Sequence, residues 1–171
     1  MYVRPQKKKH KTLPCYFPTT PSMSDETKDK FQLKSLDTDS VVVVFHSEIN
    51  KSSEIPGFIR FMEDVVLRAE NHPGCPKNFI FDARALEKYS PMVGLKLTSA
   101  IKQTSLLKDI HGVACQCVCI MGSRKTAIPA KVFAKLFNKM WAGSDLIQVL
   151  CATSHSDVEA IGQIDRKYGL S

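Results

Sequence analysis

Apolar residues recur along this chain in two spacings, which predict strands and helices in turn. Val41 to Phe45 is a run of five apolar residues, four of them β-branched, and predicts a central strand buried on both faces. Between Ser52 and Ala69 the apolar residues are three and four positions apart, which predicts an amphipathic helix with Ser53 as its N-cap. An irregular first strand is expected to start at Phe31.

The same alternation continues to the C-terminus. Strands are predicted over 78–82, 113–121 and 146–151, and helices over 91–107, 129–141 and 154–166, the last capped by Ser154 or Ser156. Alternating elements of this kind imply right-handed crossovers. The chain is therefore predicted to have an α/β fold with a mixed, mainly parallel sheet.

The first 30 residues differ from the rest and are predicted to be a flexible basic, proline-rich arm. They hold four prolines, which break both helix and strand, and a basic cluster with no acidic residue before Asp25. The net charge of the chain is +7, of which five charges belong to Arg4, Lys7, Lys8, Lys9 and Lys11. Residues 31–171 are expected to form one domain with a nearly neutral charge.

The basic cluster at 7–11 has several interpretations. Lys7, Lys8, Lys9 and Lys11 could contact a nucleic acid, an acidic surface or a nuclear import receptor. A solvated, solubilising tail explains the cluster equally well. No aromatic residue interleaves with the lysines, so a stacking platform for bases is not expected.

The chain has no apolar leader pattern and no apolar run of about 18 residues, so an intracellular protein without a transmembrane helix is expected, in the cytoplasm or, because of the basic tail, the nucleus. Its cysteines are therefore expected to be free thiols. Cys115, Cys117 and Cys119 alternate along one predicted strand and share a face. Their side chains would be about 6.5–7 Å apart, too far to converge on one ion, so no metal is expected.

The segment from Gly122 to Thr126 resembles the end of a phosphate-binding loop. The full pattern needs glycine at two positions where this chain has Cys119 and Arg124, so ATP hydrolysis is not expected. Arg124 and Lys125 could still bind an anion weakly, or form a solvated basic turn. The chain shows no nucleophile elbow, dinucleotide loop or His-x-x-x-His spacing, so no cofactor and no enzyme activity are expected.

The stretch from Asn78 to Ser99 is the most informative part of the sequence. An apolar strand ends at Asp82, which is expected to cap backbone N–H groups in the next turn or to contact a partner. Ser90 precedes Pro91 at a predicted helix start, which favours Ser90 as an N-cap. The alternative for Ser90 is phosphorylation, or a hydrogen bond to a partner.

The order of the elements resembles the STAS domain, a family that includes bacterial anti-sigma factor antagonists. The similarity covers about residues 36–165 and is carried by Val41–Val44, Asn78–Asp82, Ser90-Pro91-Met92, Lys135–Met140 and Leu146–Leu150. It implies a sheet with helices packed mostly on one face. In the antagonists the loop contains Asp-Ser-Ser-Gly, and a kinase modifies one serine. Here Ser90 replaces the aspartate, and the modified serine falls on Met92, which cannot accept phosphate.

Two functions follow as hypotheses. The first is a non-enzymatic interaction or regulatory module, similar to an anti-sigma factor antagonist, that docks a protein through residues 82–95. Its partner-binding residues would be Asp82, Ser90, Met92 and Val93, with the last two exposed. The alternative is a structural or assembly protein tethered to nucleic acid or an acidic partner by its basic arm. The sequence leaves the partner and the oligomeric state open.

Overall fold

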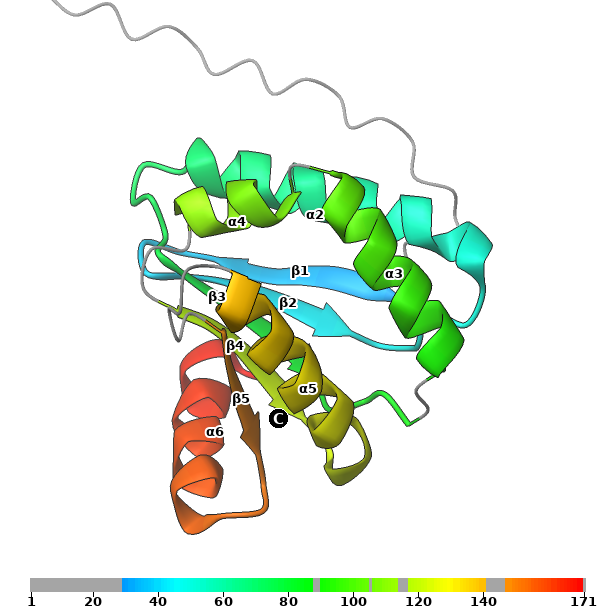
Figure 1. Ribbon diagram of the computed structural model, residues 1–171. Helices are drawn as coiled ribbons and strands as arrows, with labels where there is room; N and C mark the ends of the chain where they lie inside the picture. The colour runs from blue at the N-terminus through cyan, green and yellow to red at the C-terminus, as the bar shows by residue number, and fades with distance from the viewer. Residues whose placement is uncertain (1–28, 88–89, 105, 114–116, 141–146, 171) are drawn as a thin grey trace, which may run out of the picture.

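The computed structural model describes residues 29–87, 90–104, 106–113, 117–140 and 147–170 (Figure 1). The strands are β1 (Phe31–Leu36), β2 (Ser40–Phe45), β3 (Asn78–Ala83), β4 (Cys117–Gly122) and β5 (Ile147–Cys151). The helices are a short 3-10 turn, η1 (Ser52–Glu54), and α2 (Ile55–Glu70), α3 (Pro91–Gln103), α4 (Leu106–Val113), α5 (Arg124–Met140) and α6 (His155–Tyr168).

The described strands form one sheet in the order β1-β2-β3-β4-β5. β1 is antiparallel to β2 and carries a register shift between Leu33 and Ser35, whereas β2 to β5 are all parallel. The predicted α/β class, the mainly parallel sheet and the irregular first strand are therefore confirmed.

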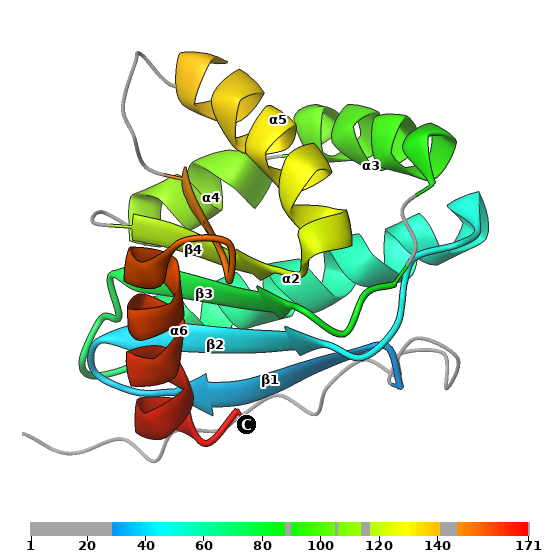
Figure 2. The same cartoon turned by 90° about the horizontal axis from the view of Figure 1, so that it is seen from below.

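The helices lie mostly on one face of the sheet. Parallel strands added one after another in the same direction, through crossovers of the same hand, place every crossover helix on the same face. The helices α2, α3, α4 and α5 are these crossovers, whereas α6 follows the last strand and covers the opposite face (Figure 2). This arrangement confirms the layering that the STAS resemblance implies.

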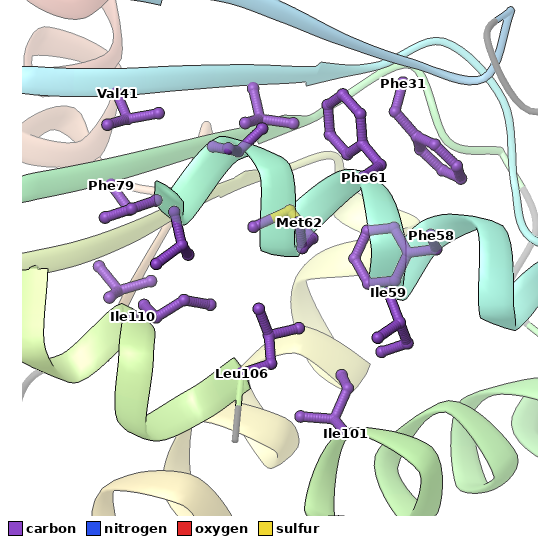
Figure 3. Close-up of a cluster of buried hydrophobic side chains, with 14 of the residues drawn as sticks. Phe31, Val41, Phe58, Ile59, Phe61, Met62, Phe79, Ile101, Leu106 and Ile110 are labelled. Atoms are coloured by element: carbon purple, nitrogen blue, oxygen red, sulfur yellow. The ribbon is translucent and has the colours of Figure 1, made fainter. Parts of the chain in front are cut away.

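Successive side chains of β2 point to opposite faces of the sheet and contribute to the core on both. Val41 and Val43 face the crossover helices and Val42 faces α6, and all three are 0% exposed. On the larger side, Phe58, Met62 and their neighbours on α2 pack with side chains of β1, β3, α3 and α4 (Figure 3). The prediction that this strand is buried on both faces is confirmed.

The helix predicted over 91–107 is in fact two helices, α3 and α4. Thr104 has extended backbone and separates them. Its hydroxyl donates to the carbonyl oxygen of Ile101 at 2.9 Å and accepts the N–H of Leu106 at 3.4 Å. One threonine side chain thus ends α3 and begins α4. Because α4 extends to Val113, the next strand starts at Cys117 rather than at residue 113.

The helix predicted to start at Pro129 starts five residues earlier, at Arg124. Ser123 and Thr126 cap each other: the Ser123 N–H donates to Thr126 Oγ1 at 2.9 Å, and the Thr126 N–H donates to Ser123 Oγ at 3.4 Å. Pro129 therefore lies inside the helix, where it has no N–H to donate to the carbonyl of Lys125.

Two other helix starts were also expected from the sequence. Ser154 caps α6 by accepting the N–H of Asp157 at 3.2 Å, as one of the two alternatives predicts. Ser53 is not the N-cap of α2, because it lies within η1 and the cap position is Glu54. In the part of the chain that the structure describes, no helix has the length and apolar character needed to cross a membrane.

Candidate functional site

The carboxyl ends of the parallel strands are the edge of an α/β sheet where binding sites are usually found. At this edge β3 ends beyond Asp82, and the chain leads to Ser90 and the start of α3. The start of α5 follows β4 at the same edge. The predicted site residues outside the arm all belong to these two strand exits.

Asp82 does not face outward but is held in a cluster of three charged side chains. It is 6% exposed, and its carboxylate oxygens accept from Nε and Nη2 of Arg84 at 2.9 and 2.8 Å. The same guanidinium donates to both carboxylate oxygens of Asp165 on α6, at 2.9 and 2.6 Å. One arginine thus joins the exit of β3 to the C-terminal helix through two bidentate pairs.

The electrostatics of this cluster are consistent with a structural tie. Hydrogen bonds to Asp82 and then to Asp165 raise the pKa of Arg84 above its ordinary value, so the arginine stays charged. Asp82 also accepts the backbone N–H of Arg84 at 3.1 Å, which is the local capping expected from the sequence. Its oxygens are therefore engaged within the domain, and as a docking residue Asp82 would have to give up these bonds.

The other two members of the Asp82 cluster, Arg84 and Asp165, were not identified from the sequence. Arg84 lies two residues further on, and an Asp-x-Arg pattern at a strand exit is a weak signal for such a pair. Asp165 is 81 residues beyond Arg84, and nothing local marks it.

Ser90 occupies the N-cap of α3, as predicted. Its Oγ accepts the N–H of Val93 at 3.4 Å, and Pro91 holds the first helical position. The residue is exposed, so the hydroxyl is accessible to a partner or a modifying enzyme.

The first turns of α3 present a different apolar pair from the one expected. Met92 is 64% exposed, as predicted, but Val93 is 9% exposed and packs in the core, so its expected exposure is wrong. Neighbouring helical positions point about 100° apart, and Val93 shares its face with Leu97 and Ile101 at steps of four. Leu95, which the periodicity assigned to the buried side, is 67% exposed and lies three residues from Met92.

The charges of the domain are unevenly distributed over its helices. α3 carries two cations and α5 carries five, all exposed, and neither helix contains an acidic residue: Lys96, Lys102, Arg124, Lys125, Lys131, Lys135 and Lys139. Ile128 and Val132 on α5 are also 72% and 57% exposed, although the pattern placed Val132 on the buried side. Figures 1 and 2 show α3 and α5 as neighbours, and we call their exposed surface the α3–α5 face.

Arg124 and Lys125 lie in the first turn of α5, exposed as a basic turn would be. The glycine before them has a packing role. A Cβ at Gly122 would lie 3.1 Å from Thr126 Oγ1 and 3.3 Å from Ala127, so a side chain there would require the helix start to shift by a few tenths of an ångström. Anion contact by Arg124 and Lys125 stays a prediction.

The cysteine strand is a packing surface as far as the structure describes it. Cys117 and Cys119 pack beneath α6, whereas Cys115 lies outside the described residues. Burial raises the pKa of both thiols, that of Cys119 to about 12 with smaller contributions from Cys117 and Asp157. Such thiols are protonated at neutral pH and are poor nucleophiles. Among the described residues, no three His, Cys, Asp or Glu side chains are grouped to hold a metal.

Lys7, Lys8, Lys9 and Lys11 of the arm also lie outside the described residues. Comparisons with protein-family models, with curated proteins and with solved structures find no match to this chain.

Proposed function

We propose that this chain is a non-enzymatic protein–protein interaction or regulatory module, resembling an anti-sigma factor antagonist of the STAS family, that docks through the first turns of α3. One observation carries the proposal: Met92 and Leu95 are 64% and 67% exposed on a helix whose other face is packed into the core. A rigid helix that presents two large apolar side chains next to each other is typical of a docking surface.

The surrounding charge supports a partner with acidic character. The exposed cations of the α3–α5 face have no acidic residue beside them on their own helices. Complementary charge speeds association and disfavours basic partners, while the apolar contacts supply most of the binding free energy.

Ser90 is the proposed point of regulation. A phosphate there would place a charge of roughly −2 at the N-terminus of α3, only two residues from Met92. The helix dipole and nearby N–H groups favour the phosphate in the free protein. A partner whose apolar surface covers Met92 would have to remove water from this phosphate, which costs free energy. Phosphorylation of Ser90 is therefore proposed to release the partner.

Affinity purification from the native source tests the docking surface. The immobilised full chain is compared with Met92→Glu and with Leu67→Glu, a matched control that changes a 55% exposed leucine on α2. Met92→Glu is expected to reduce the captured partner at least about tenfold, because burying a methionine contributes about 1.5–3 kcal/mol. Ser90→Glu should act in the same direction. A partner retained equally by Met92→Glu and Leu67→Glu would exclude this surface.

A second candidate is a structural or assembly protein tethered by its basic arm to nucleic acid or an acidic partner. The seven exposed cations on α3 and α5 favour it, because they would add to those of the arm. Deleting residues 1–12 should then abolish assembly, and binding by the full chain should weaken steeply with salt. Binding by the truncated chain that does not respond to salt would contradict it.

A further inference from the structure

A groove runs between the C-terminal half of α5 and the edge strand β5, away from the start of α3. Its volume is about 510 Å³. It is lined by Lys131, Ala134, Lys135, Asn138, Lys139, Ile147 and Val149. Figure 1 shows α5 lying alongside β5, the two elements that form its walls.

One wall of the groove is a row of positive charge. Lys131, Lys135 and Lys139 follow each other at steps of four along α5, and all three are exposed. At a rise of 1.5 Å per residue, their positions are about 6 Å apart along the helix axis, and the row spans about 12 Å. The rest of the lining is mainly aliphatic, from Ala134, Ile147 and Val149.

The backbone edge of β5 is largely occupied within the domain. The Asn138 side chain donates to the carbonyl oxygen of Ile147 at 3.0 Å and accepts its N–H at 2.9 Å. Further along, the N–H of Cys151 donates to Asp157 Oδ2 at 3.2 Å. At these two positions the backbone of β5 is already paired within the domain, so recognition of a ligand there depends on side chains.

We propose that this groove binds an extended acidic peptide segment of a partner protein, in which acidic residues alternate with aliphatic ones. Alternate side chains of an extended chain point the same way and are about 6.5–7 Å apart, close to the spacing of the lysines. Three alternating carboxylates span about 13 Å and match the row from Lys131 to Lys139. The intervening aliphatic side chains face the opposite wall, towards Ile147 and Val149.

The lining favours a peptide over a nucleic acid with the same charge spacing. Single-stranded nucleic acids bind where aromatic side chains stack on their bases, and none of the described residues that line the groove is aromatic. The basic arm of this chain is also excluded as the occupant, because its lysines would face those of α5. The groove is distinct from the Met92 surface, so this proposal stands whether or not docking occurs there.

Fluorescence anisotropy on the full chain tests the proposal. The probe is a labelled heptapeptide of alternating glutamate and valine with blocked ends. The control peptide has the same composition, with the four glutamates followed by the three valines. The alternating peptide is expected to bind more tightly at low salt, and its affinity should fall as ionic strength rises.

Matched protein variants assign the binding to the groove. Lys135→Glu is expected to weaken the alternating peptide by about fivefold or more, because it replaces an attraction with a repulsion. Lys77→Glu, an exposed lysine before β3, changes the net charge equally and should alter binding by less than about twofold. Met92→Glu should likewise leave peptide binding unchanged, which separates this test from that of the proposed function. Thermal unfolding confirms that each variant is folded.

Three results would overturn the proposal. The first is equal loss of binding in Lys135→Glu and Lys77→Glu, which would show only a general charge effect. The second is equal binding of the two peptides, which would show that the groove does not recognise the alternation of acidic and aliphatic residues. The third is a single-stranded oligonucleotide that binds more tightly than the peptide and loses its affinity in Lys135→Glu, which would make the groove a nucleic-acid site.

Discussion

Replacing Arg84 tests whether the C-terminal helix is held by charge. Arg84→Met keeps the aliphatic length of the side chain and removes the guanidinium that joins Asp82 to Asp165. Two carboxylates are then left near each other without a cation among their hydrogen-bond partners. We expect the domain to be destabilised and α6 to be its most affected helix.

The magnitude follows from how far the three side chains are buried. The exposed fractions of the side chains alone are 28% for Arg84, 9% for Asp82 and 16% for Asp165. Breaking a fully buried pair costs about 3–5 kcal/mol, and an exposed pair contributes about 0–1 kcal/mol. This cluster lies between the two, so we expect a loss of about 2–3 kcal/mol. For a chain of this size that corresponds to a decrease in Tm of about 5–10 °C.

The assay is chemical and thermal unfolding followed by circular dichroism, with Arg68→Met as the matched control. Arg68 forms an exposed pair with Asp64 on α2 at 2.8 Å, so its loss should cost about 0.5 kcal/mol or less. The double variant Arg84→Met/Asp165→Asn should lose less unfolding free energy than the two single variants lose together, because both substitutions remove the same interaction. A stability loss in Arg84→Met no larger than that in Arg68→Met would show that the Arg84 cluster does not hold α6.

Three further changes test other parts of the structure. Burial raises the pKa of Glu54, but hydrogen bonds from Lys30 and two backbone N–H groups outweigh burial and lower the pKa below 4.5. The stability that Glu54 contributes is therefore present above about pH 4.5 and lost as the pH falls. Glu54→Gln should therefore reduce the free energy of unfolding at pH 7 and converge with wild type in acid; a constant difference between them would contradict this. Maleimide at pH 8 should label exposed Cys75 well before Cys119, whose pKa is about 12, as peptide mass spectrometry can show; equal rates would be evidence against the buried thiol. Asn138→Ala should expose the backbone edge at Ile147, cost about 1 kcal/mol and promote self-association in sedimentation velocity; a variant as stable and monodisperse as the wild type would argue against edge protection.

Much of the fold could be predicted because it depends on local pattern. The run Val41–Phe45 can be satisfied only where both faces of a strand are covered, and the structure buries Val41, Val42 and Val43 completely. The Ser90-Pro91 pair also marks a helix start by local chemistry alone, and that start is confirmed. The errors in element boundaries came from single side chains: Thr104 divides one predicted helix, and the capping by Ser123 moves the start of another.

The candidate site was less predictable, because its geometry depends on contacts remote in sequence. Asp82 has an obvious local role, but its strongest contacts involve Arg84 and, through it, Asp165 on a helix whose position follows only from the completed sheet. The exposure of Met92 and Leu95 depends on the rotation of α3 about its axis, which the packing of Val93 decides. A sequence pattern shows that a helix has an apolar side, but not which of two adjacent residues is at its border.

The net charge of the domain does not predict the charge exposed on its individual helices. Residues 31–171 are nearly neutral in total, which by itself argues against an acidic partner for the domain. The acidic residues, however, are absent from α3 and α5, where seven cations are exposed beside Met92, Leu95, Ile128 and Val132. The field near a surface depends on the charges within about 10 Å and not on the total. A partner at the start of α3 and an acidic peptide in the α5–β5 groove would therefore each meet the exposed cations of the helix that it contacts. Met92→Glu and Lys135→Glu, changed one at a time, separate apolar docking from binding to the lysine row.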